Sequence, residues 1–193
     1  SNGKNFYKWA NIKYKLGMIN FRNDDILQVR VFSKKQGKRL KPDTAFQSFL
    51  KCDEVFEKYN YPQILAVLSE GINYYPDWVD YIKKNHHRYQ IELHGFRHYY
   101  YNHDIHTAES AYKDLKRAKD ELENIFQCKI TTWFIPYGKK HYPLWREEVC
   151  QRLGLICDSP SVKNPFMFHY WHRDQVEEVK KMIEEDVKRP SSA

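Results

Sequence analysis

The chain has 193 residues and a formal net charge of +7, and 41% of its residues are hydrophobic. A chain of this length can bury the core of one globular domain, so we expect a single domain over residues 1–193. The longest uninterrupted apolar run is Ile64–Leu68, which is far too short to cross a bilayer and excludes a membrane span. The positive charge suits nucleic acid, anionic glycan or a membrane surface as a partner, but it is equally typical of a lysine-rich solvated surface.

Cysteine spacing and the chain ends give little functional information. The absence of CxxC spacing argues against a zinc knuckle or a thioredoxin-like redox pair and makes free thiols the default expectation. The four cysteines are Cys52, Cys128, Cys150 and Cys157. Ser1–Gly3 is expected to be a tag remnant and residues 189–193 a disordered tail, while the absence of a signal peptide leaves the compartment open.

Short apolar runs rich in β-forming residues alternate with longer amphipathic stretches, which predicts βα units and a mostly parallel sheet. Strands are expected, in chain order, at Leu16–Phe21, Ile64–Leu68, Tyr89–Leu93, Thr131–Ile135, Leu155–Asp158 and Phe166–Tyr170. The longest helix is expected from about Thr107 to Phe126, where apolar residues recur every three or four positions. Further helix starts are indicated by Thr44 with Gln47, by Pro76, by Pro143, and by Asp174 with Glu177.

Reactive side chains gather at the ends of four expected strands. In an α/β sheet or barrel the carboxyl ends of the strands face the functional rim, so these segments are the ones to examine for chemistry. They are Asn23–Asp25, His94–His98, Pro136–Gly138 and His169–His172.

His94 and His98 form a pair whose spacing suits a shared metal ion, because a tight turn or a helical turn puts both imidazoles on one side. Asp25 is the best oxygen ligand, since adjacent carboxylates in a confined site repel each other unless a cation offsets their charge. Asp24 then remains free to accept a proton from the attacking water. The alternatives are two surface histidines and a solvated turn acid or helix cap.

In these motifs and their order the sequence resembles the polysaccharide deacetylase family, also called the NodB-homology or carbohydrate esterase family 4 proteins. The resemblance implies an α/β fold, a distorted and incomplete (β/α) barrel, that removes N- or O-acetyl groups from glycans. It also implies that Asp24 is the catalytic base and that Asp25, His94 and His98 bind a divalent metal. Zn²⁺ is the expected ion, with Co²⁺, Ni²⁺ or Mn²⁺ as alternatives. The family's first motif, threonine-phenylalanine-aspartate-aspartate-glycine, is matched only by the two acids.

The third family motif, arginine-x-proline-tyrosine-glycine, is matched by Phe134–Gly138. By resemblance, the backbone amide of Tyr137 helps to stabilise the oxyanion. Phe134 stands where the family has an arginine that pairs with the base aspartate. Substitutes for that arginine could be Arg22, Arg97 or Arg173.

The last family motif, leucine-x-histidine, is matched by Met167-Phe168-His169. By resemblance, His169 is the general acid for the leaving amine, and Met167 lines the pocket for the acetyl methyl group. Asp158 corresponds to the family's aspartate that tunes this histidine. In the second motif, Gly95 replaces the usual serine or threonine.

The sequence therefore predicts a metal-dependent hydrolase that removes acetyl groups from acetylated oligo- or polysaccharides, without an organic cofactor or a nucleic-acid partner. A rival interpretation is a non-catalytic glycan-binding protein that kept the barrel and lost turnover, which the missing arginine and the degraded first motif favour. A third, a basic nucleic-acid-binding protein, depends on charge alone, because no helix-turn-helix, zinc-finger or RNA-binding signature is present.

Overall fold

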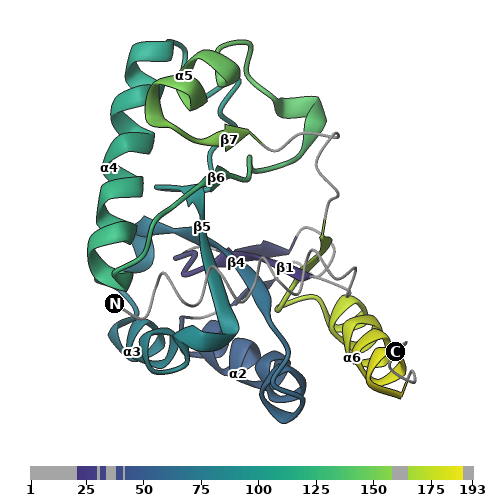
Figure 1. The fold of residues 1–193 in the computed structure, drawn as a ribbon. Helices are drawn as coiled ribbons and strands as arrows, with labels where there is room; N and C mark the ends of the chain where they lie inside the picture. The colour runs from purple at the N-terminus through teal and green to yellow at the C-terminus, as the bar shows by residue number, and fades with distance from the viewer. Residues whose placement is uncertain (1–20, 30, 34–37, 41, 158–164, 189–193) are drawn as a thin grey trace, which may run out of the picture.

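A computed structural model of the chain describes residues 21–29, 31–33, 38–40, 42–157 and 165–188. It is built on a six-stranded parallel sheet with the strand order β7-β6-β5-β4-β1-β8 (Figure 1). The sheet is open, with β7 at one edge and β8 at the other. This confirms the predicted α/β class with an incomplete barrel. The strands are β1 (Phe21–Ile26), β4 (Gln63–Leu68), β5 (Tyr89–Gly95), β6 (Thr132–Trp133), β7 (Ile156–Cys157) and β8 (Phe166–His169).

Helices cover the sheet along its length. The longest, α4 (Ala108–Phe126), packs on β5 and on α5 (Arg146–Leu153), and α6 (Arg173–Lys188) packs on β8 and α2 (Pro42–Lys58) (Figure 1). None of the helices in the described ranges is long and apolar enough to span a bilayer. The remaining elements are an antiparallel pair, β2 (Val31–Ser33) and β3 (Lys38–Leu40), the helix α3 (Pro76–Lys84), and the single-turn helices η1 (Ser69–Gly71), η2 (His86–Arg88) and η3 (Lys139–His141).

Because side chains alternate between the two faces of a strand, one face of the sheet packs in the main core and the other faces the candidate functional site. One face of the sheet contributes Phe21, Leu65, Leu93 and Phe168 to a large core that it shares with the helices. The opposite, inner face has only a small apolar cluster of Ile64, Ala66 and Phe134. Its other buried side chains are polar, which is unusual for a strand interior and marks this face for function. They include Arg22, Asp24, Glu92 and His94.

The first strand differs most from its prediction. It was expected at Leu16–Phe21, but the structure places β1 at Phe21–Ile26, so Asp24 and Asp25 lie in the strand rather than after it. Residues 16–20 lie outside the described ranges. The polar run of β1 hides it from a search for apolar alternation, although every one of its six residues is buried.

Two predicted helix starts are confirmed and three are shifted. Pro76 begins α3, and Thr107 caps α4 by accepting a hydrogen bond from the Ser110 amide at 3.1 Å. The helix expected from Pro143 begins instead at Arg146, because residues 143–146 form a turn closed by a backbone hydrogen bond of 3.2 Å. The other two shifts are α2, which begins at Pro42 before Thr44, and α6, which begins at Arg173 before Asp174.

The expectation of free thiols is wrong for one pair of cysteines. Cys150 in α5 and Cys157 in β7 form a disulfide, with their Cα atoms 6.1 Å apart. The helix and the strand are joined by a tight turn at Gly154, whose φ of 66° is left-handed, and this turn brings the two cysteines together. The thiol of Cys52 stays free and buried.

Candidate active site

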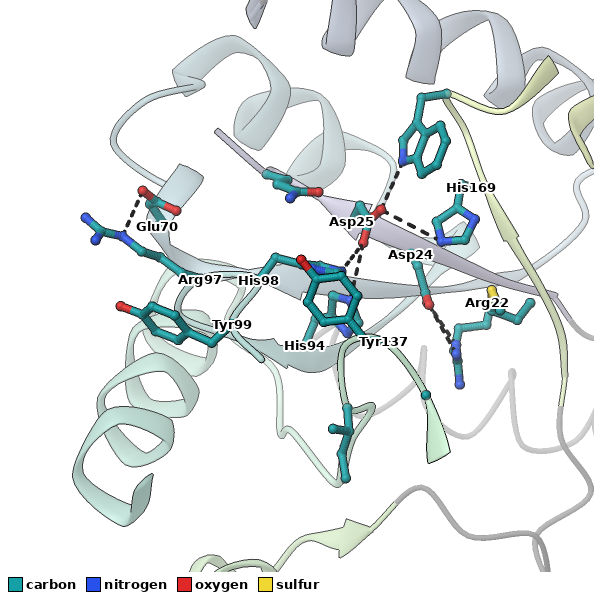
Figure 2. A pocket seen from close by; sticks show the side chains of 15 residues that line it. Arg22, Asp24, Asp25, Glu70, His94, Arg97, His98, Tyr99, Tyr137 and His169 are labelled. Carbon is teal, nitrogen blue, oxygen red and sulfur yellow. Dashed lines mark hydrogen bonds and ion pairs between the residues drawn. The ribbon is translucent and has the colours of Figure 1, made fainter. Parts of the chain in front are cut away.

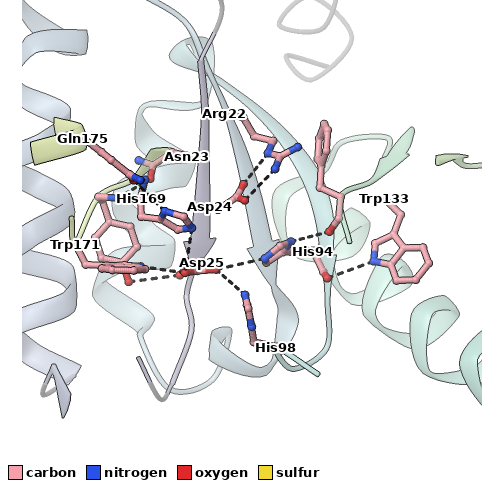
Figure 3. A network of polar contacts seen from close by, with 12 residues as sticks. Arg22, Asn23, Asp24, Asp25, His94, His98, Trp133, His169, Trp171 and Gln175 are labelled. Atoms are coloured by element: carbon pink, nitrogen blue, oxygen red, sulfur yellow. Dashed lines mark hydrogen bonds and ion pairs between the residues drawn. The ribbon is translucent and has the colours of Figure 1, made fainter. Parts of the chain in front are cut away.

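The three predicted metal ligands meet at the carboxyl end of the sheet (Figure 3). Asp25 lies in β1, His94 in β5, and His98 in the loop that follows β5. The Oδ1 atom of Asp25 is 3.3 Å from Nε2 of His94 and 3.0 Å from Nε2 of His98. One ligand atom from each residue lies within 4.8 Å of the other two, so the three side chains can share one ion.

The donors and their hydrogen bonds fit a divalent ion. Nδ1 of His94 donates to the backbone carbonyl of Phe134 at 2.6 Å, which leaves the lone pair of Nε2 facing Asp25. Asp25 Oδ1 and His94 Nε2 are buried, yet neither has a hydrogen-bond partner in the described structure. Atoms that bind one tetrahedral zinc ion at about 2.0–2.2 Å lie about 3.3–3.6 Å apart, close to the separations from Oδ1 seen here.

The charge state of Asp25 also suits a ligand. Burial by itself opposes ionisation of this carboxyl group, but the imidazoles of His94 and His98, whose Nε2 atoms face its Oδ1, hold its pKa well below the usual value. The nearby charges of His98 and His169 act in the same direction. Asp25 is therefore a carboxylate at neutral pH, as a metal ligand must be.

Arg22 takes the place of the arginine that the third motif lacks. Its Nε donates to Asp24 Oδ1 at 2.8 Å and its Nη2 to Asp24 Oδ2 at 3.1 Å, a two-point contact that fixes the carboxylate plane (Figure 3). The guanidinium lies over the ring of Phe134, with Cζ 4.4 Å from the ring centroid. Phe134, which stands where the family has its arginine, thus packs against Arg22. Asp24, the predicted base, has Arg22 as a buried cationic partner.

His169 lies beside the two acids. The register of β1 and β8 pairs Asp24 with His169 directly, and Nε2 of His169 is 3.8 Å from Asp25 Oδ2. The other ring nitrogen, Nδ1, is 3.0 Å from Oε1 of Gln175 in α6, and that oxygen also accepts from the His169 amide at 2.8 Å. Because an amide oxygen can only accept, Nδ1 is the donor in this contact. Asp158, predicted to tune this histidine, lies outside the described residues, and Gln175 was not foreseen.

The loop after β6 places Tyr137 at the edge of the site. Tyr137 has a φ of 69° and is 45% exposed. One face of its ring stacks on Tyr100 with a centroid separation of 3.7 Å, and the ring meets that of His98 at 4.4 Å and near a right angle. These contacts hold the loop close to the predicted ligands, where its backbone amide was predicted to act.

A pocket of about 680 Å³ connects these residues (Figure 2). Its wall includes the three predicted ligands, Asp24, His169, Tyr137, Met167 and Trp171, to which the sequence assigned no role. At its rim, Nε of Arg97 and Oε1 of Glu70 form an ion pair of 3.0 Å. Arg97 therefore pairs with Glu70 rather than with Asp24. This volume lies within the range of ordinary small-molecule binding sites.

Gly95 departs from the family motif for a steric reason. Its φ is 140°, a conformation that residues with a Cβ rarely adopt, and a Cβ there would lie 2.2 Å from the hydroxyl oxygen of Tyr101. Tyr101 is fully buried, with its ring 5.1 Å from that of Trp133. A buried tyrosine therefore occupies the space that a serine or threonine at position 95 would need.

The fold and the site define an α/β protein with a buried candidate metal centre of one aspartate and two histidines at the carboxyl end of a parallel sheet. The chain belongs to the polysaccharide deacetylase family, whose model matches residues 46–155. The match includes His94, His98 and Tyr137, but ends before β8 and begins after β1. The roles of Asp24, Asp25 and His169 therefore depend on the original motif resemblance and on the geometry above.

Solved structures of family 4 carbohydrate esterases have the same fold. A pseudoenzyme of this family from Bacillus anthracis aligns with a TM-score of 0.64 and 10% identity, over 89% of this chain and 60% of its own. Peptidoglycan deacetylase PdaC from Bacillus subtilis aligns with a TM-score of 0.58 and 14% identity, over 86% of this chain and 82% of its own. A family 4 carbohydrate esterase from Streptomyces lividans, in complex with acetate, aligns with a TM-score of 0.59 and 11% identity, over 86% of this chain and 85% of its own. No curated protein sequence matches the chain.

Proposed function

We propose that the chain is a metal-dependent hydrolase that removes acetyl groups from N-acetylated glycans, with O-acetylated glycans as a second substrate class. The observation that carries the proposal is the meeting of Asp25, His94 and His98 with Asp24 and His169 in one pocket. Family membership supports a deacetylase, and one structural neighbour is a peptidoglycan N-acetylglucosamine deacetylase.

In this proposal Asp25, His94 and His98 would hold the ion, which supplies Lewis acidity to the acetyl carbonyl and to the attacking water. Asp24 accepts the proton of that water, and its two hydrogen bonds from Arg22 keep it oriented. The backbone amide of Tyr137 stabilises the developing oxyanion.

His169 completes the reaction. In its imidazolium form, which carries a proton on each ring nitrogen, His169 gives the Nε2 proton to the departing sugar amine, so that the products are acetate and a free amine. Gln175 keeps the ring in place by accepting from Nδ1, which aims Nε2 at the pocket. Met167, which is 43% exposed in the pocket wall, contacts the acetyl methyl group.

The rival function is glycan binding without turnover. It draws support from a fold neighbour described as a pseudoenzyme, and from the departures of this chain at the first and third motifs. The pairing of Arg22 with Asp24 weighs against it, because a chain that no longer needed a base would have no need of a substitute arginine.

The decisive experiment combines metal analysis with acetate release from N-acetylglucosamine oligomers. The proposal expects about one equivalent of divalent ion and acetate release that a chelator abolishes and Zn²⁺ restores. Asp24→Asn is the matched variant, since the amide fills the same space, leaves the ligands intact and cannot accept the proton. Oligomer binding without acetate release, over many acetylated glycans, would establish the rival function instead.

A further inference from the structure

The two carboxylate oxygens of Asp25 have different surroundings. Oδ1 faces the Nε2 atoms of His94 and His98 and has no hydrogen-bond partner in the described residues. Oδ2 accepts a hydrogen bond of 3.0 Å from Nε1 of Trp171 (Figure 3). One oxygen is thus held by an indole N–H, and the other is left to face the two imidazoles.

The backbone of Asp25 is held by the same segment as its side chain. Asp25 has a φ of 63° and lies where the pairing of β1 with β4 shifts, an irregularity that re-aims a side chain and interrupts the strand ladder. Asn23 Oδ1 accepts from the Tyr170 amide at 3.1 Å, and the Tyr170 hydroxyl donates to the Asp25 carbonyl at 3.4 Å. The contact from Trp171 adds a side-chain hydrogen bond to these two between β1 and the segment that follows β8.

We propose that Trp171 fixes Asp25 as a one-oxygen ligand and thereby sets the affinity of the site for its divalent ion. This inference rests on the proposed metal site and adds to it a residue that none of the family motifs contains. A group that hydrogen-bonds to a metal ligand orients it, and loss of such a group typically costs 10–100-fold in metal affinity. Without the indole N–H, Oδ2 is free to turn toward Nε2 of His169, 3.8 Å away, and the turn moves Oδ1 off its line to the histidines.

Two substitutions separate the N–H of Trp171 from its ring. Trp171→Phe keeps aromatic packing against His169, whose ring centroid is 4.7 Å away, but has no donor. Trp171→Gln has no ring, but its amide N–H can reach the same oxygen. Trp145→Phe is the control, because Trp145 stacks on Trp133 and does not line the pocket. The measurement is the Kd for Zn²⁺ by competition with a chromogenic chelator, on the full chain.

The proposal expects a Kd about 10–100-fold higher for Trp171→Phe, a value within a few-fold of wild type for Trp171→Gln, and no change for Trp145→Phe. Wild-type affinity in a folded Trp171→Phe variant would overturn it, as would a loss in the Gln variant that matches the loss in the Phe variant. If the Phe variant does not fold, the Gln variant decides alone, and a tenfold loss there refutes the role of the N–H. A wild-type chain that binds no Zn²⁺ would remove the proposed metal site itself, whereas tight wild-type binding with unchanged variants removes only the role of Trp171.

Discussion

Arg22 pairs with Asp24, as the arginine missing from the third family motif would be expected to do. Arg22→Met tests whether the protein needs this pair. Methionine keeps a long unbranched side chain and removes the guanidinium. Asp24 then loses both hydrogen bonds that hold its carboxylate, at 2.8 and 3.1 Å, while staying about 4% exposed. The perturbation thus leaves a buried acid without its ion-pair partner.

The structure sets the size of the effect. Breaking a buried ion pair by removing one partner costs about 3–5 kcal/mol, and the lower end applies because Asp24 borders a pocket. For a chain of this length about 3 kcal/mol lowers Tm by roughly 6–12 °C. Loss of the oriented base should lower kcat for acetate release by about 10²–10⁴.

A second-site change makes the test specific. The guanidinium of Arg22 lies over the ring of Phe134. An arginine at position 134 would therefore stand beside the place that the guanidinium of Arg22 leaves. Arg22→Met with Phe134→Arg restores the family's arrangement and should regain at least a tenth of wild-type activity. The control is Arg152→Met, since Arg152 also stacks on a ring, that of Tyr112, and pairs with Glu109, but at the surface. Unchanged activity in Arg22→Met, or no recovery in a folded double variant, would refute the reasoning.

Two further predictions concern the histidine pair and a buried acid of the inner face. His94→Ala and His98→Ala should each lose the metal in elemental analysis yet remain folded by circular dichroism, and full metal occupancy in both would contradict the ligand assignment. Burial raises the pKa of Glu92 from 4.5 to about 8, partly offset by hydrogen bonds from Thr131. The folded state therefore holds more protons than the unfolded chain between about pH 4.5 and 8, so the free energy of unfolding should fall as pH rises through that window. The fall is at most about 4–5 kcal/mol at 1.36 kcal/mol per pKa unit, and Glu92→Gln should remove most of it in urea titrations from pH 5 to 8. Parallel pH curves for the two chains would count against the raised pKa.

The ligand pair and the fold class could be predicted from sequence, because local spacing carries both. The two histidines four residues apart were expected just after a strand, and the structure places His94 just before the end of β5 and His98 in the loop beyond it. The strand β4 was predicted to within one residue and β5 to within two, since β5 continues to Gly95. A run of apolar residues was sufficient to predict a strand wherever its side chains pack in the core of the sheet.

The rest of the site depends on how distant strands meet, which no local pattern records. The sequence could name Arg22 only as one of three arginines able to pair with Asp24. The choice among them depends on Arg22 and Asp24 both facing inward from β1. Trp171 reaches Asp25 across 146 residues, and does so because β1 and β8 pair in the register that sets Asp24 opposite His169. Polar strand interiors defeat pattern-based prediction in general, because their burial is stabilised by partners elsewhere in the chain.

The last prediction separates the work of His169 from that of the metal ligands. An amide must expel a poor amine leaving group, which needs a proton, whereas an activated acetate ester expels a good leaving group that does not. His169→Ala should therefore lower amide hydrolysis by about 10² or more and ester hydrolysis much less, with metal content unchanged. Gln175→Leu removes the oxygen that accepts from Nδ1 at 3.0 Å and should shift the two rates in the same direction by a smaller factor, while Gln175→Glu keeps an acceptor and should retain the amide rate better than the Leu variant. Equal losses for both substrates with the metal retained would show that His169 positions the substrate or Asp24. Loss of the metal would show that His169, whose Nε2 is only 3.8 Å from Asp25 Oδ2, is itself a ligand.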